Sequence, residues 1–129
     1  MKAEMESKLI EFNQDLLQLS EMEHPMACFS YAKELYAQLM EGNIRHLGPQ
    51  KEKAVFDLVY KYLNVAKNKG INSAFFYLGM IHLEGIYVDR DVEKAFDLYV
   101  EGAARNNAYC FFELSRIYGE GEGHIEPDP

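Results

Sequence analysis

The 129-residue sequence contains no tryptophan, only two cysteines, and fewer basic than acidic side chains, 13 against 21. The net charge of −8 and the lack of a Lys/Arg cluster exclude a general nucleic-acid-binding role, because phosphate would be repelled. No apolar run reaches the roughly 18 residues that a membrane-spanning helix needs, and the amino terminus is acidic where a secretion signal is basic. We therefore expect no membrane insertion and an intracellular location, in the cytoplasm or another reducing compartment.

Cysteine and histidine are too sparse to predict a metal or redox site. Cys28 and Cys110 lie far apart within apolar helical patterns, which predicts buried free thiols rather than a disulfide. The four histidines share no metal-ligand spacing with each other or with a cysteine. The acidic loops at 88–93 and 120–128 lack the ligand spacing of a calcium loop, and no nucleophile has a local base. We expect no metal, no cofactor and no enzymatic activity.

Helical periodicity is the dominant signal in the sequence. Residues 3–22 carry apolar side chains at alternating steps of four and three, which predicts one amphipathic helix: Met5, Leu9, Phe12, Leu16 and Leu19. This helix either packs on or caps the rest of the chain, or mediates dimerisation. Pro25 suits the first turn of a second helix that runs to Gly42.

Turn residues divide the remainder into further helices. The predicted spans are 51–70, 73–85, 92–106 and 108–118. The candidate N-caps are Asn72 or Ser73 for the fourth helix and Asp89 or Asp91 for the fifth. Strand-like alternation is absent from the sequence, so the predicted class is all-α with about six helices.

One segment occurs three times in the sequence. "YAKELYAQLMEG" (31–42), "AFFYLGMIHLEG" (74–85) and "CFFELSRIYGEG" (110–121) align without gaps, with Leu35, Leu78 and Leu114 in register. The leucine fills the space between two helices, and the small residue after it, Gly79 or Ser115, lets a neighbouring helix approach. Since a mid-helix glycine costs about 1 kcal/mol relative to alanine, we expect close packing at Gly79.

The segment 74–104 resembles the Sel-1-like repeat, a short relative of the tetratricopeptide repeat. The matching residues are Ala74, Leu78, Gly79, Gly85, Val88, Asp91, Lys94, Ala95, Ala103 and Ala104. The third copy supplies Leu114, Tyr118, Gly121 and Gly123. Three positions depart from the pattern: Tyr87 replaces a glycine, His82 replaces an aromatic residue, and Tyr36 occupies the Gly79 position in a degenerate first copy.

The resemblance implies a right-handed superhelix of antiparallel helix pairs that acts as a non-catalytic adaptor for a protein or peptide partner. Residues 1–24 would be the added amphipathic helix. Two and a half repeats would span 25–121 (25–70, 71–106 and 107–121), followed by an acidic tail, 122–129. Some secreted bacterial members look like hydrolases and carry a disulfide in each repeat. The cysteine pairs that mark them are absent from this sequence, which disfavours that activity.

In such a superhelix the first helix of each pair lines the concave groove. The predicted groove residues are Lys33, Ala37, Met40, Phe76, Met80, Leu83, Phe112 and Arg116. They form an apolar strip with a cation at either side, suited to a partner helix or an extended peptide. The alternative is that Phe76, Met80 and Leu83 pack as ordinary core residues.

The sixth helix lacks the partner helix that a complete repeat would supply. An unpaired repeat leaves an apolar face open, here formed by Cys110, Phe111, Leu114 and Ile117. Three arrangements would cover this face: further repeats in a longer chain, a second copy in a homodimer, or another subunit of a larger complex. In a fourth arrangement the amino-terminal helix caps the opposite end, and the stack is only marginally stable.

Overall fold

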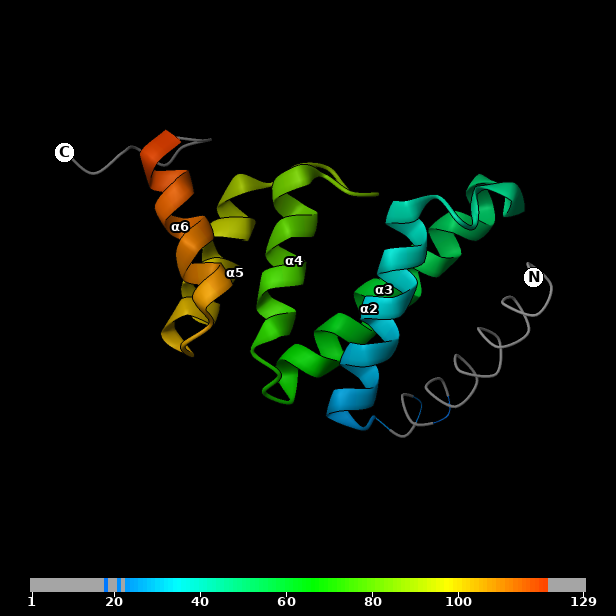
Figure 1. Cartoon of the computed structure of the whole chain (residues 1–129), viewed down its shortest axis with the longest axis horizontal. Coiled ribbons are helices and arrows are strands. Elements are labelled where there is room, and N and C mark those ends of the chain that lie inside the picture. Colours follow the sequence, from blue (N-terminus) through cyan, green and yellow to red (C-terminus); the bar gives the residue numbers. More distant parts are fainter. Residues whose placement is uncertain (1–17, 19–20, 22, 121–129) are drawn as a thin grey trace. The chain divides into compact units, whose positions relative to one another are not determined.

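Five α-helices and one short 3₁₀ helix make up the part of the chain that the computed structural model describes, residues 18, 21 and 23–120. These residues contain no β-strand, which confirms the all-α class. The chain forms two compact units, Met1–Gly70 and Ile71–Pro129 (Figure 1). The helix predicted over 3–22 and the tail 122–129 lie outside the described residues, apart from residues 18 and 21.

Unit 1 is a helical hairpin. Helix α2 (Pro25–Glu41) packs against α3 (Pro49–Asn68), and η1 (Arg45–Leu47) lies in the connection (Figure 1). Helix α2 starts at Pro25 as predicted, and His24 Nδ1 accepts a hydrogen bond from the Ala27 amide at 3.3 Å. It ends at Gly42, whose φ of 75° is the left-handed conformation that glycine adopts without strain.

The core of unit 1 comes from one face of each helix. The buried side chains recur at steps of three and four: Cys28, Ala32, Leu35 and Leu39 on α2, and Phe56, Val59, Leu63 and Ala66 on α3. Tyr31 and Tyr62 join the two helices edge to face, with ring centroids 5.5 Å apart. Burial of each large apolar side chain stabilises the hairpin by about 1.5–3 kcal/mol, so packing rather than helix propensity holds it together.

Unit 2 contains three helices: α4 (Ser73–Glu84), α5 (Val92–Ala104) and α6 (Ala108–Glu120). Helix α5 packs against both α4 and α6. Helix α4 ends at Gly85 as predicted, with a φ of 68°. Of the two candidate caps, Asp91 caps α5, because its carboxylate accepts a hydrogen bond from the Lys94 amide at 3.0 Å. The Arg90 side chain closes the same turn by donating to the Leu83 carbonyl at 2.9 Å.

Two asparagines tie the helix ends of unit 2 together. Asn72 holds the N-cap position of α4, but its side chain makes no capping hydrogen bond there. Its Nδ2 instead donates to the Arg105 carbonyl at 3.0 Å and so links the start of α4 to the end of α5. Asn107 Oδ1 accepts from the Cys110 amide at 3.0 Å and caps the start of α6.

Two glycines set the distances between the helices of unit 2. A Cβ placed on Gly79 would lie 2.5 Å from the Tyr99 ring, so α4 and α5 approach as closely as predicted at this glycine. A Cβ on Gly102 would lie 2.4 Å from Cys110 Sγ, which makes Gly102 the contact point between α5 and α6. Both distances are far inside van der Waals contact, so a side chain at either position requires the Tyr99 ring or the Cys110 side chain to shift, or the helices to move apart.

Gly79→Ala should destabilise the protein despite the better helix propensity of alanine. The methyl group would displace the buried Tyr99 ring, and overpacking of this kind costs about 1–3 kcal/mol. The matched control is Gly119→Ala, because a Cβ at Gly119 meets nothing within 4 Å. Chemical denaturation should show a lower unfolding free energy for Gly79→Ala and an unchanged or slightly higher one for Gly119→Ala. Equal behaviour of the two variants would contradict close packing at Gly79.

Tyr87, which stands where the Sel-1-like pattern has a glycine, has a φ of 57°. The left-handed conformation costs a residue with a Cβ roughly 1–2 kcal/mol. Tyr87→Gly should therefore be about 1 kcal/mol more stable than Tyr87→Ala, a control that removes the ring but keeps the Cβ. Thermal or urea unfolding of the two variants measures this difference. A Tyr87→Ala variant as stable as Tyr87→Gly would show that the backbone at this turn is unstrained.

Candidate protein-interaction surface

The predicted groove residues of unit 1 lie on α2 and differ in exposure. Lys33 and Met40 are exposed, and Ala37 is half-buried. Their spacing of four and three places them on one side of the helix, away from the buried Leu35 and Leu39. Unit 1 therefore presents a narrow mixed strip along α2 that combines one cation with one flexible apolar side chain.

The predicted groove residues of α4 are more enclosed. Leu83 is only 3% exposed, and Phe76 and Met80 are half-buried. Phe76 belongs to an aromatic cluster with one ring from each of the other two helices of unit 2: its centroid lies 6.4 Å from that of Tyr99 on α5 and 5.5 Å from that of Tyr109 on α6. Phe76 thus contributes to packing within unit 2.

The residues predicted to form the open face of the sixth helix differ in exposure. Cys110 and Ile117 are completely buried and Leu114 is half-buried, whereas Phe111 is 66% exposed. Cys110 and Ile117 are two turns apart on the side of α6 that meets α5, as the contact between Gly102 and Cys110 shows. They are therefore buried packing residues, and Phe111 belongs to a different face of the helix.

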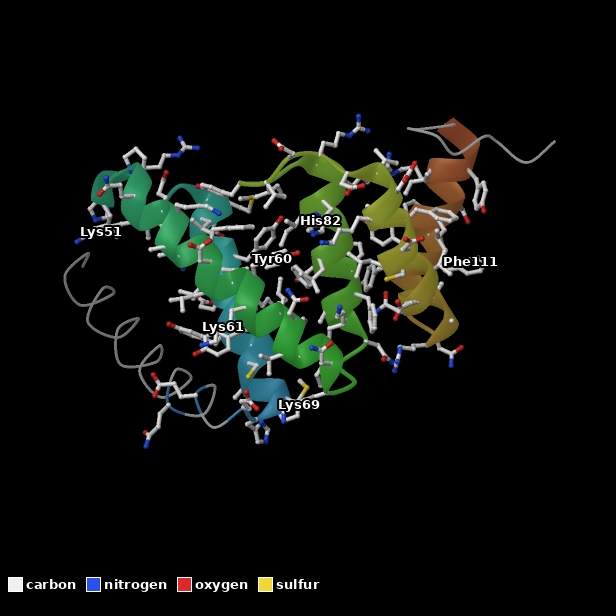
Figure 2. All side chains as sticks on the ribbon, turned by 180° about the vertical axis from the view of Figure 1, so that it is seen from behind. Lys51, Tyr60, Lys61, Lys69, His82 and Phe111 are labelled. Carbon is white, nitrogen blue, oxygen red and sulfur yellow. The ribbon has the colours of Figure 1, made fainter. Side chains whose placement is uncertain are left out.

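The outward side of α6 forms a separate surface, which we call the α6 face. Its exposed residues are Ala108, Phe111, Phe112, Ser115, Tyr118 and Gly119. Phe112 is 66% exposed, and Figure 2 shows Phe111 pointing outward from α6. The Ser115 hydroxyl donates to the Phe111 carbonyl at 3.1 Å, so its donor is satisfied within the helix. The face carries no charged side chain and is dominated by aromatic rings.

Arg116, a predicted groove residue, lies at the edge of the α6 face in an ion pair with Glu113. The Arg116 Nη2 to Glu113 Oε2 distance is 2.9 Å, and both side chains are partly buried. Burial raises the pKa of the nearby Tyr99 hydroxyl, and the Glu113 carboxylate raises it further. The Tyr99 hydroxyl is buried and has no hydrogen-bond partner among the described residues. An uncharged, unbonded hydroxyl is therefore enclosed between α4, α5 and α6.

Tyr99→Phe should leave the protein as stable as the parent or more stable by about 1 kcal/mol. The substitution keeps the ring that packs on Gly79 and removes a buried hydroxyl, whose desolvation without a partner costs about 1–3 kcal/mol. Urea unfolding monitored by circular dichroism measures the difference. Destabilisation by more than about 1 kcal/mol would mean that the hydroxyl has a bonding partner in solution.

The other titratable groups in the core of unit 2 are held uncharged. Burial raises the pKa of the Cys110 thiol to about 11, with Glu113 as the second cause, so the thiol stays protonated at neutral pH. Burial lowers the pKa of His82, and Lys94 lowers it further, with partial opposition from Asp91. His82 is thus a neutral, buried side chain at a position where the repeat pattern has an aromatic residue. Both groups act as core residues.

Three residues that determine how the helices of unit 2 pack beneath this surface were missed by the sequence interpretation: Tyr99, Gly102 and Tyr109. The signal for Gly102 is its place seven residues after Ala95 on the buried side of α5, where a helix-interior glycine indicates close packing. Tyr99 follows Leu98 and falls on the same buried side. Tyr109 is 70% exposed and gives no apolar periodic signal, because the residues four and seven places further along α6, Glu113 and Arg116, are charged.

Among the described residues, no group of three His, Cys, Asp or Glu side chains is placed to hold a metal ion. Within the same part of the chain, every helix is too short or too polar to cross a membrane. Cys28 and Cys110 are both free thiols. No protein-family model, curated protein or solved structure matches the chain.

Proposed function

We propose that this protein is a non-catalytic protein-binding scaffold and that the α6 face is one of its binding surfaces. The observation that carries the proposal is the exposure of Phe111 and Phe112, each 66% exposed on a helix whose other side, with Cys110 and Ile117, is buried against α5. Exposed aromatic side chains in one patch are typical of protein–protein interfaces, where they supply most of the binding energy.

We further propose that the two hairpins are Sel-1-like repeats of a right-handed superhelix. Two observations support this assignment. Gly79, at the glycine of the repeat pattern, is the point where α4 approaches the Tyr99 ring of α5, and Tyr87 adopts a left-handed backbone at a position of a pattern glycine. In such a superhelix Lys33 and Met40 of α2 would lie on the first helix of a repeat, the helix that lines the groove.

A peptide-display selection against the full chain tests the binding function. Peptides enriched by the parent protein should bind a double variant, Phe111→Ser with Phe112→Ser, at least tenfold more weakly, because the rings are the expected anchors. Thermal stability of this variant should change little, since both side chains are mostly exposed. Fluorescence anisotropy with the enriched peptides gives the affinities.

The matched control is Leu47→Ser, which removes an exposed apolar side chain from unit 1. It should leave the affinity for the selected peptides unchanged. A selection that enriches no peptide would overturn the proposed function. If the peptides bind the double variant as tightly as the parent, the binding surface lies elsewhere than on α6.

A further inference from the structure

A row of acidic side chains runs along α5. Glu93, Asp97 and Glu101 are spaced four residues apart and are all exposed, so they lie one above the other on the outward side of the helix. Lys94 is also exposed and borders this row. We call Glu93, Asp97 and Glu101 the acidic row.

The acidic row lies beside the α6 face. The Phe96 ring on α5 contacts the Tyr118 ring on α6 with centroids 5.5 Å apart, so this side of α5 borders the α6 face. Val100 is one turn further along α5 on the same side and is 42% exposed. At about 100° of rotation per helical residue, Val100 lies between Phe96 and the acidic row around α5, and Glu93 is the member of the row nearest to that side. Unit 2 thus presents an aromatic face with a negative edge.

The α6 face has space for the close approach of another helix. Ala108, Ser115 and Gly119 are small residues that alternate along the face with the aromatic rings. A Cβ added at Gly119 would meet nothing within 4 Å, in contrast to those at Gly79 and Gly102. The missing side chain of Gly119 therefore serves no packing within the described residues and leaves the helix backbone there open to the approach of another helix.

We propose that the α6 face binds an amphipathic helix of another protein that carries large apolar residues on one face and a row of Lys or Arg along one edge. This inference rests on the proposed function and specifies the partner. The apolar residues would pack against the Phe111 and Phe112 rings and over the backbone at Gly119. The basic edge would lie over the acidic row, within the distance of about 8 Å over which charges interact at physiological ionic strength.

Charge argues against a second copy of the chain as the occupant. Two α6 faces related by a two-fold axis in an antiparallel pair would place both α5 helices on the same side of the interface. Asp97 and Glu101 of one copy would then face their counterparts, and like charges across an interface are unfavourable. Residues 71–129 contain eleven acidic and four basic side chains in all, which strengthens the repulsion.

The chain's own amino-terminal segment is also a poor match. Residues 1–24 have the apolar periodicity of an amphipathic helix, but they carry six acidic and only two basic side chains. Such a segment has the same sign of charge as the acidic row. A basic helix from another protein is therefore favoured over a second copy of the chain and over the chain's own amino-terminal segment.

The size of the α6 face sets the expected strength of binding. With about 200 Å² for each fully covered aromatic side chain, the exposed parts of Phe111, Phe112 and Tyr118 amount to on the order of 350 Å². Together with an equal area on the partner, this is below the roughly 1,200 Å² of stable complexes. We expect a reversible complex with a dissociation constant of about 10 μM.

Two synthetic 18-residue helical peptides test the inference on the full chain. Both carry leucines along one face; one has lysines along one edge, and the other has glutamates at the same positions. In fluorescence anisotropy the lysine peptide should bind at least tenfold more tightly than the glutamate peptide, and its affinity should fall as salt is raised. Asp97→Lys with Glu101→Lys should reverse this preference. Phe111→Ser with Phe112→Ser should weaken lysine-peptide binding at least tenfold.

Glu41→Lys with Asp57→Lys is the matched charge control, because it changes the net charge equally at exposed positions of unit 1. It should alter the affinity for the lysine peptide less than twofold. An equal response to both charge-changing variants would overturn the inference, since binding would then follow net charge. Lysine-peptide binding that survives the loss of both rings would also overturn it.

Two further outcomes separate the inference from the proposed function. A homodimer in light scattering that dissociates in the Phe111→Ser, Phe112→Ser variant would make a second copy the occupant and overturn the inference. If neither synthetic peptide binds while display-selected peptides still do, the inference fails and the binding function stands. If no peptide of any kind binds, both fail.

Discussion

The contact between Gly79 and the Tyr99 ring is the constraint on which unit 2 depends. Because residue 79 has no side chain, α4 comes close enough to α5 for a Cβ there to lie 2.5 Å from the ring. The same ring contacts Phe76 on α4, and its hydroxyl lies within the electrostatic reach of Glu113 on α6. One buried aromatic side chain on the middle helix therefore connects all three helices, and its position depends on the glycine.

A second glycine contact, between Gly102 on α5 and Cys110 on α6, determines which side of α6 is left exposed. Gly102 admits Cys110 Sγ against the α5 backbone, so the side of α6 that carries Cys110 and Ile117 becomes the buried side. The phenylalanines at 111 and 112 then point away from α5, because successive helical residues are rotated by about 100°. The exposure of the α6 face is thus a consequence of how small residue 102 is, as well as of the apolar sequence of α6 itself.

Capping residues made the helix boundaries predictable from the sequence. The α6 face could not be predicted in the same way, because it depends on contacts between helices. Gly42 and Gly85 were predicted as helix ends and adopt the left-handed conformation, and Asp91 was one of two predicted caps. For α6, hydrophobic periodicity could not identify the buried side, because apolar residues occur on both sides of that helix. The predicted open face consequently combined buried Cys110 with exposed Phe111, and only the glycine on the neighbouring helix distinguishes the two sides.

An aromatic face alone would bind many apolar helices with little selectivity, because burial of apolar surface has no direction. Selectivity requires an element that disfavours the wrong partner, and like charges near an apolar contact act in this way. Around α5, Val100 lies between Phe96 and the acidic row, so a helix that extends from the rings onto this side of α5 places one of its edges toward the row. An acidic helix would be repelled there, and so would a second copy of the chain. The acidic row therefore turns an otherwise permissive apolar surface into one that selects for the charge of its partner.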